Sequence, residues 1–206
     1  MRKYFVEAIG TFLLVFVGTF IITESGGSTI VISLGFGITL GIIVMLFGSV
    51  SGAHVNPAVS LGAWIRGDFS TSDIVPYWIA QFIGAIAGSF LLYSIVDHGI
   101  GIGETVFTME PVNAFLIEAV LTFVFVMVIF KMGNKKPLHA ALAIGGTLFV
   151  IHLIAFSLTG ASVNPARSIA PVVVGGSVQA AGQIWVYVLG PFVGAVVAGI
   201  TARRHI

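Results

Sequence analysis

The chain has 206 residues, of which 57% are hydrophobic and only 8% are charged, and its formal net charge is +1. A soluble domain carries about 25% charged residues, so this composition excludes a soluble enzyme, a disordered chain and a nucleic-acid-binding protein. The sequence contains no cysteine, which excludes disulfides, thiolate metal ligands and a thiol nucleophile. The class that remains is a polytopic membrane protein.

Six apolar stretches are long enough to cross a lipid bilayer, for which a helix needs about 20 residues. In chain order they are Phe5–Ile22, Ile30–Val50, Ile74–Val96, Val112–Phe130, Leu138–Leu158 and Ile184–Ala202. Polar or helix-breaking segments separate them, and each stretch is apolar on nearly all sides, as contact with lipid requires. The sequence therefore predicts an all-α membrane protein, with one transmembrane domain over residues 1–206.

The charged residues sort by side when the N-terminus is placed inside the cell. The basic residues that then face the cytoplasm are Arg2, Lys3, Arg66, Lys131, Lys135, Lys136, Arg203 and Arg204, and the acids that face outward are Glu24, Asp97, Glu104 and Glu110. This is the positive-inside pattern, and it predicts that both termini are cytoplasmic. Arg167, before the last span, is the one basic residue that breaks the pattern.

The two halves of the chain, about 1–103 and 112–206, resemble each other. Three matches recur in the same order: the Glu7 segment at Glu118, Val55-Asn56-Pro57-Ala58 at Val163-Asn164-Pro165-Ala166, and Phe82-Ile83-Gly84-Ala85 at Phe192-Val193-Gly194-Ala195. Each half holds three spans, an odd number, so the second half is expected upside down relative to the first. Such an inverted repeat places a substrate site near the middle of the bilayer.

Each half also contains an Asn-Pro-Ala segment followed by an apolar helix too short to span, Ala58–Trp64 and Ala166–Val174. Asn is a preferred helix N-cap and Pro suits the first helical position. A single such segment would indicate an ordinary capped surface helix. Because the motif occurs once in each inverted half, we expect two re-entrant half-helices that enter from opposite faces and meet at their N-termini.

That arrangement predicts a narrow apolar tube with a polar stripe. Each helix N-terminus carries about half a positive charge and unpaired N–H groups. The side-chain oxygen of Asn56 and of Asn164 is expected to cap its own helix, with the NH₂ group donating into the tube. The preceding loops, Gly52–Val55 and Gly160–Val163, would offer carbonyl acceptors. Such a tube suits a small neutral hydrogen-bonding solute and opposes cations.

The paired Asn-Pro-Ala motifs, the Glu-x-x-x-Thr-Phe segments and the run from Ser162 to Ser168 resemble the aquaporin (major intrinsic protein) family over essentially the whole chain. The resemblance implies six transmembrane helices plus two re-entrant half-helices. It also implies a passive water channel without cofactor or metal, a homotetramer with one pore per subunit, and a place in the plasma membrane.

By the same resemblance, the narrowest point of the pore is formed by Phe36, His152, Ala161 and Arg167. Phe36 with His152 is similar to the water-selective branch, whereas glycerol-conducting members usually have Trp and Gly there and an Asp in place of Ser168. Ala161 is smaller than the Thr or Cys common in water channels. Glycerol, ammonia and hydrogen peroxide therefore remain alternative solutes.

Three further residues carry structural expectations. Glu7 and Glu118 resemble the glutamates that brace the re-entrant loops of the family, and His54 is expected to pack beneath the first loop. An ion-coupled secondary transporter is a weaker alternative, because both glutamates lie far in sequence from the Asn-Pro-Ala segments. No catalytic motif is present, so we expect no enzyme activity.

Overall fold

The computed structural model describes residues 1–96, 101–133 and 135–203. In these ranges the chain forms eight helices and no strand: α1 (Arg2–Glu24), α2 (Thr29–Ser51), α3 (Pro57–Arg66), α4 (Thr71–Ile95), α5 (Pro111–Met132), α6 (Pro137–Thr159), α7 (Pro165–Gly175) and α8 (Val178–Thr201). Asp97 and Arg204, to which the sequence assigned opposite sides of the membrane, lie outside the described residues.

The six long helices are α1, α2, α4, α5, α6 and α8, and each is long and apolar enough to cross a membrane. The predicted all-α fold is therefore confirmed. The largest difference is at α8, which begins at Val178 rather than near Ile184. The side chain of Ser177 accepts a hydrogen bond from the backbone N–H of Ala180 and caps this helix. The polar residues Gln179 and Gln183 in its first turns lowered the hydropathy that marked the span.

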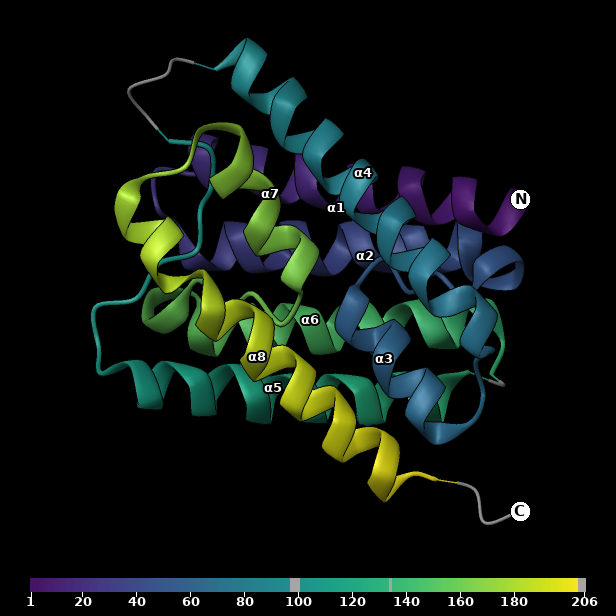
Figure 1. Cartoon of the computed structure of the whole chain (residues 1–206). Coiled ribbons are helices and arrows are strands. Elements are labelled where there is room, and N and C mark those ends of the chain that lie inside the picture. The colour runs from purple at the N-terminus through teal and green to yellow at the C-terminus, as the bar shows by residue number, and fades with distance from the viewer. Residues whose placement is uncertain (97–100, 134, 204–206) are drawn as a thin grey trace.

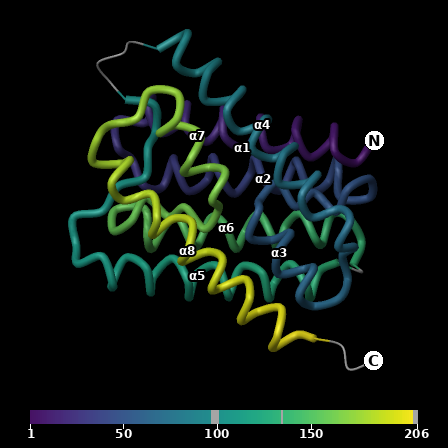
Figure 2. Tube along the Cα trace, viewed as in Figure 1, coloured from purple at the N-terminus to yellow at the C-terminus, as the bar shows by residue number. Residues whose placement is uncertain are grey.

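The inverted repeat is visible in the helix lengths and in the arrangement of the chain. Helices α2 and α6 have 23 residues each, and α6 begins 108 residues after α2. Figures 1 and 2 show α1, α2, α5 and α6 running side by side, with α4 and α8 crossing them obliquely. The start of α1 and the end of α8 lie at the same end of the molecule (Figure 1), which is called below the end that carries the termini.

Two glycines at matching positions let the oblique helices pack closely on their partners. A Cβ atom on Gly84 of α4 would lie 2.0 Å from the carbonyl oxygen of Ala8 in α1, and one on Gly194 of α8 would lie 2.1 Å from the carbonyl oxygen of Ala119 in α5. Neither contact could be made with a larger residue. The repeated Gly-Ala pair in the sequence therefore marks the same helix crossing in each half.

The short helices α3 and α7 have 10 and 11 residues, which corresponds to about 15 Å of helix, or half of the hydrocarbon thickness. Each begins with a proline at its first position. Helix α3 lies in the half of the molecule that carries the termini, and α7 lies in the other half (Figure 1). The long helices surround them, so both are re-entrant elements.

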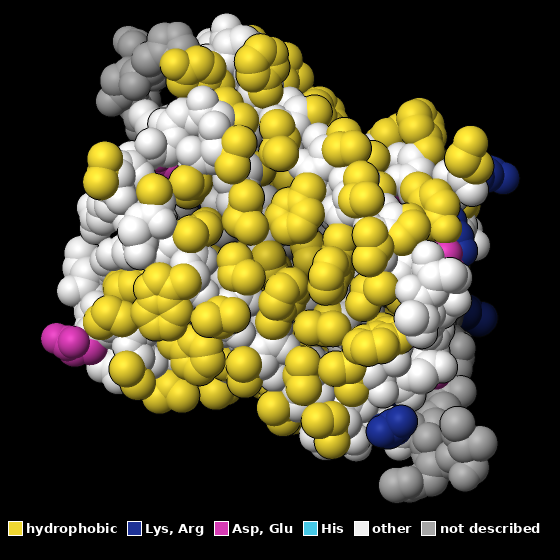
Figure 3. Space-filling model, in the orientation of Figure 1, with side chains coloured by type: hydrophobic (Ala, Val, Ile, Leu, Met, Phe, Trp, Pro, Cys, Tyr) yellow, Lys and Arg dark blue, Asp and Glu magenta, His cyan; other side chains and the backbone are white. Residues whose placement is uncertain are grey.

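Many large apolar side chains are exposed on the outer surface, among them those of Phe5, Ile38, Phe90 and Ile200. Figure 3 shows hydrophobic side chains across the middle of one face, with Lys and Arg gathered at the end of the molecule that carries the termini. A surface this apolar belongs in lipid rather than in water. The chain is a multi-pass membrane protein.

Candidate functional site

The asparagines of the two motifs cap the short helices. The Oδ1 atom of Asn56 accepts from the N–H of Ala58 at 2.8 Å, and Oδ1 of Asn164 accepts from the N–H groups of Ala166 and Arg167 at 3.0 and 3.4 Å. Both asparagines have extended backbones, as residues at an N-cap do. The caps fix both amide groups at the helix N-termini, where the helix dipoles concentrate positive potential.

The same two side chains join the halves of the molecule. Nδ2 of Asn56 donates to the carbonyl oxygen of Val163 at 2.7 Å, and Nδ2 of Asn164 donates to the carbonyl oxygen of Val55 at 2.9 Å. From the sequence we expect each NH₂ group to donate into the tube. Because an amide nitrogen carries two hydrogens, one is used across the repeat interface and one is left for a solute.

The loops that precede both asparagines have an unusual backbone. Ala53, Val55, Ala161 and Val163 all have φ between 43° and 49°. A left-handed conformation is unfavourable for residues with a side chain, above all for β-branched valine. The strain recurs at the same places in both loops, so both are held by contacts elsewhere in the protein.

Glu7 of α1 holds the first loop. Its carboxylate accepts from the N–H groups of His54 and Val55 at 2.9 and 2.7 Å, and from the Ser51 hydroxyl and the Gln81 amide at 2.6 and 2.8 Å. Its side chain is fully buried. A buried carboxylate with four donors is a strong structural anchor, and none of its bonds points toward a solute path.

Glu118 of α5 is the equivalent residue for the second loop. It accepts from the N–H groups of Ser162 and Val163 at 3.0 and 2.7 Å and from the Thr159 hydroxyl at 2.8 Å. No glutamine completes this set, because Pro191 stands where the first half has Gln81. Within the described part of the chain, the second carboxylate therefore has three hydrogen-bond donors, whereas the first has four.

A narrow cavity of about 20 Å³ lies between the two loops and helices α2 and α6. Its walls include Phe36, Asn56, His152, Asn164 and Arg167, together with apolar side chains such as those of Leu14, Leu40, Phe125 and Leu148. The structure thus brings together predicted site residues from α2, α6 and α7 and from the N-caps of α3 and α7. A space of at least about 10–15 Å³ is needed to hold one water molecule, so the cavity is large enough for water.

Phe36 and His152 form one side of this cavity. Their rings are stacked, with centroids 4.2 Å apart and planes inclined by 20°. Nδ1 of His152 lies 3.0 Å from the carbonyl oxygen of Leu148, which can only accept, so Nδ1 carries the hydrogen. In the neutral ring Nε2 is then an acceptor. Nε2 is buried and has no hydrogen-bond partner among the described residues.

Arg167, in the first turn of α7, lines the same cavity. Its guanidinium carbon lies 5.4 Å from the centre of the Phe36 ring, and its side chain is only 1% exposed. One nitrogen donates to the carbonyl oxygen of Gly103 at 2.8 Å. The other two, Nε and Nη2, have no partner within the described chain. Donors on Arg167 and an acceptor on His152 therefore face the same small space.

Ala161 is placed differently from the other predicted residues. It is fully buried in the apolar core and is not part of the cavity wall. Its N–H donates to the Thr159 hydroxyl at 3.2 Å. The structure therefore brings Phe36, His152 and Arg167 together, and it leaves the Ala161 side chain behind the loop.

No pattern in the sequence predicted the hydrogen bonds between the segment 101–109 and the first turn of α7, which carries Arg167. The segment 101–109 supplies the Gly103 carbonyl, and the Thr105 hydroxyl donates to that of Ser168 at 2.8 Å. Ser168 in turn bonds the Ser162 hydroxyl. No motif marks Thr105 in the sequence. Tyr77 and Tyr187, which donate to the carbonyl oxygens of Ser51 and Thr159, could have been found, since they recur 110 residues apart.

His54 lies beneath the first loop, as expected. Its Nδ1 atom is 3.0 Å from the Ser60 hydroxyl, and its ring packs against Phe69 and Tyr77 with centroids 5.0 and 5.3 Å away.

Comparison with known proteins gives consistent matches. Residues 1–201 match the family model described as "Major intrinsic protein". A solved structure, the aquaglyceroporin from Plasmodium falciparum, superimposes with a TM-score of 0.88 and 27% identity, over 97% of this chain and 93% of that one.

Two bacterial relatives are similar along nearly their whole lengths. "Glycerol uptake facilitator protein-like 6" of Lactiplantibacillus plantarum is 40% identical, over 98% of this chain and 97% of its own. "Aquaporin Z" of Rhodopseudomonas palustris is 38% identical, over 98% of this chain and 92% of its own. These names point to two solutes, so the geometry of the site has to distinguish them.

Proposed function

The chain belongs to the major intrinsic protein family, and from this we propose that it is a passive water channel. Asn56-Pro57-Ala58 and Asn164-Pro165-Ala166 form the centre of the pore, and Phe36, His152 and Arg167 form its selectivity filter. Ala161 contributes to the filter only through its backbone. Glu7 and Glu118 brace the two loops and take no part in transport.

The small volume of the cavity is the observation that favours water over glycerol as the solute. The space enclosed by Phe36, His152, Arg167 and the two asparagines is about 20 Å³. A water molecule occupies about 30 Å³ in the liquid and needs only part of that as free space. Glycerol has six heavy atoms and is too large for this space unless the side chains that line it, such as Phe36 and His152, move. The filter therefore favours water over polyols.

The polar groups of the filter match the hydrogen bonds of water. Nε2 of His152 can accept, and Nε and Nη2 of Arg167 can donate. Water does both and can replace part of its lost hydration there. The cost of leaving bulk water is therefore reduced for a neutral solute of this size.

Fixed positive charge explains the exclusion of ions. The buried Arg167 guanidinium and the N-termini of α3 and α7 line the same path. An Arg and half-helix dipoles exclude protons and cations in aquaporin-type pores. The acids Glu7 and Glu118 are bonded to the loops and lie outside the cavity wall, which argues against an ion-coupled transporter.

A facilitator of other small neutral solutes is the alternative function. The similarity to a glycerol uptake facilitator-like protein and to an aquaglyceroporin structure supports it. The stacked rings of Phe36 and His152 argue against glycerol. Ammonia and hydrogen peroxide are close to water in size and remain secondary solutes of the proposed channel.

The proposal extends to assembly and location. We propose a homotetramer with one pore per subunit, as the resemblance to aquaporins implies, and one transmembrane domain over 1–206 with repeats 1–103 and 112–206. Bacterial relatives support the plasma membrane. The clustering of Lys and Arg at the end that carries the termini supports cytoplasmic termini, because basic loops are retained inside.

The experiment is a comparison of water, glycerol, ammonia and hydrogen peroxide permeability on one preparation of proteoliposomes. We expect fast water flow and glycerol flow close to that of protein-free vesicles. Glycerol flow as far above the lipid background as water flow would replace the main proposal with the alternative.

A further inference from the structure

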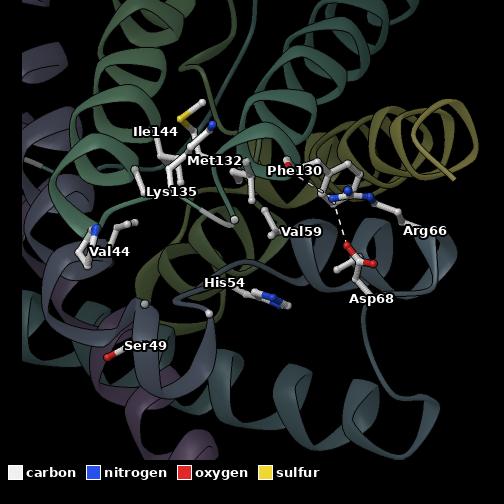
Figure 4. A pocket seen from close by; sticks show the side chains of 17 residues that line it. Val44, Ser49, His54, Val59, Arg66, Asp68, Phe130, Met132, Lys135 and Ile144 are labelled. Carbon is white, nitrogen blue, oxygen red and sulfur yellow. Dashed lines mark hydrogen bonds and ion pairs between the residues drawn. The ribbon is translucent and has the colours of Figure 1, made fainter. Parts of the chain in front are cut away.

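A second and much larger cavity opens at the end of the molecule that carries the termini. Its volume is about 560 Å³, and it lies between the ends of α2, α3 and α5 and the start of α6. Figure 4 shows Val59 near its centre, Arg66 and Asp68 on one side, and Lys135 on the other. Small-molecule sites usually measure about 300–1,000 Å³, so this vestibule is large enough for an organic ligand.

The inverted repeat explains why the floor of the vestibule is apolar. The offset of 108 residues that relates α2 and α3 to α6 and α7 pairs Val44 with His152 and Val59 with Arg167. It also pairs Phe36 with Ile144. Val44, Val59 and Ile144 all line the vestibule. Each of these three filter residues thus has an aliphatic counterpart among the described residues that line the vestibule.

The rim of the vestibule is polar and carries more positive than negative charge. Among the described residues that line it, Arg66 and Lys135 are cations and Asp68 is the one carboxylate. Arg66 lies 3.1 Å from Asp68, donates to the carbonyl oxygen of Phe130 at 3.3 Å, and stacks on the Phe130 ring at 4.7 Å. These contacts hold the guanidinium in place at the rim, where it contributes a fixed positive charge.

We propose that this vestibule binds a small organic anion with an apolar body, and that the bound anion blocks water flow. Arg66 and Lys135 flank the vestibule from its two sides and together give it a positive potential that attracts the anionic group. The apolar body covers the floor formed by Val44, Val59 and Ile144. The ligand cannot continue inward, because the next cavity has only about 20 Å³. Blocking rests on the proposed water-channel function, whereas binding does not.

Benzenesulfonate is a suitable probe because it is ionised at all ordinary pH values and has an apolar ring. Benzenesulfonamide is its neutral counterpart. Saturation-transfer NMR on the full-length protein in detergent measures binding, and stopped-flow light scattering on proteoliposomes with the probe on both sides measures water flow. We expect saturable binding of the sulfonate, weaker binding of the sulfonamide, and a loss of water flow in proportion to occupancy.

Two lysines provide a matched pair of variants. Lys135 and Lys131 are both exposed at this end of the molecule, but only Lys135 lines the vestibule. Lys135→Gln should weaken benzenesulfonate binding roughly two- to fivefold, as loss of one exposed ion pair does, and Lys131→Gln should leave it unchanged. Arg66→Gln should weaken it further, and Lys135→Gln keeps the test valid if Arg66→Gln does not fold.

Each result has a defined meaning. Absence of saturable binding, equal binding of the sulfonamide, or equal effects of the two lysine variants would overturn the site. Binding with undiminished water flow would overturn the block. A protein that conducts no water would refute the proposed function, and the NMR measurement would still decide whether the site exists.

Discussion

Asn56 and Asn164 each donate a side-chain amide hydrogen to the carbonyl group that precedes the other, at 2.7 and 2.9 Å. Each also caps its own half-helix. One pair of residues therefore sets the ends of two helices and locks the two inverted halves together. The second hydrogen of each amide is what the pore can offer to a solute.

Replacing Asn56 by Ala should destabilise the protein by about 2 kcal/mol. About 1 kcal/mol comes from the lost helix cap and about 1 from the lost bond to Val163. Ser177→Ala removes a cap from α8 without any link between the halves, so it should cost about half as much. Thermal unfolding of the purified variants measures both, and equal losses would contradict the role of the inter-repeat bond.

Widening the filter should admit glycerol. Phe36→Trp combined with His152→Gly gives the pair typical of glycerol-conducting members and removes the ring stacked on Phe36. We expect a clear rise in glycerol uptake by proteoliposomes. The control is Val44→Gly, which introduces a glycine at the position in the wide vestibule that corresponds to His152 in the repeat. An unchanged ratio of water to glycerol flow in the double variant would show that the filter lies elsewhere.

Removing the charge of Arg167 should open a leak. Arg167→Val takes away the buried guanidinium at the constriction, and we expect measurable proton or cation flux that the native channel lacks. Arg167→Lys keeps a positive charge and should remain tight to cations. A pH-sensitive dye inside proteoliposomes records the proton flux. The explanation of ion exclusion fails if the valine variant is as tight as the native channel.

The two glutamates should differ in their tolerance of substitution. A glutamine at either position loses one acceptor for a backbone N–H and gains an NH₂ group. At position 7 that group has a partner at hand, since Oε1 of Gln81 is buried without one in the described structure. At position 118 the new NH₂ group meets no such glutamine, because Pro191 occupies the place that Gln81 has in the first half. Glu118→Gln should therefore lower the unfolding free energy by about 1–3 kcal/mol more than Glu7→Gln.

Thermal unfolding in detergent measures this difference, and the double variant Glu7→Gln with Gln81→Leu serves as the control. Without Gln81 the advantage of position 7 should disappear. Equal stability of the two single glutamine variants would contradict the assigned hydrogen bonds.

Much of the fold could be predicted because membrane insertion constrains the sequence strongly. Apolar length gave the six spans, and the repeated Asn-Pro-Ala segments gave the two re-entrant helices. The start of α8 was missed because Gln179 and Gln183 lower the local hydropathy, although the helix continues through them. Length and polarity describe the lipid-facing part of a helix better than its ends.

The sequence indicated candidate site residues only where a side chain, and not a backbone group, makes the interaction. Asn56, Asn164, His152 and Arg167 could be picked from motif and spacing. The Gly103 carbonyl that holds Arg167 is a backbone group, and no residue type marks it. Ala161 shows a different limit: the resemblance assigns it to the filter by its position in the sequence, but sequence position does not indicate that its backbone is left-handed and its side chain fully buried.

The central claim is tested most directly by the temperature dependence of water flow. Proteoliposomes and protein-free vesicles of the same lipid are shrunk by an osmotic step in a stopped-flow instrument at several temperatures. We predict fast shrinkage with an activation energy near that of free diffusion in water, since a pore lets water pass without dissolving in hydrocarbon. Shrinkage as slow and as strongly temperature-dependent as that of the empty vesicles would contradict the account.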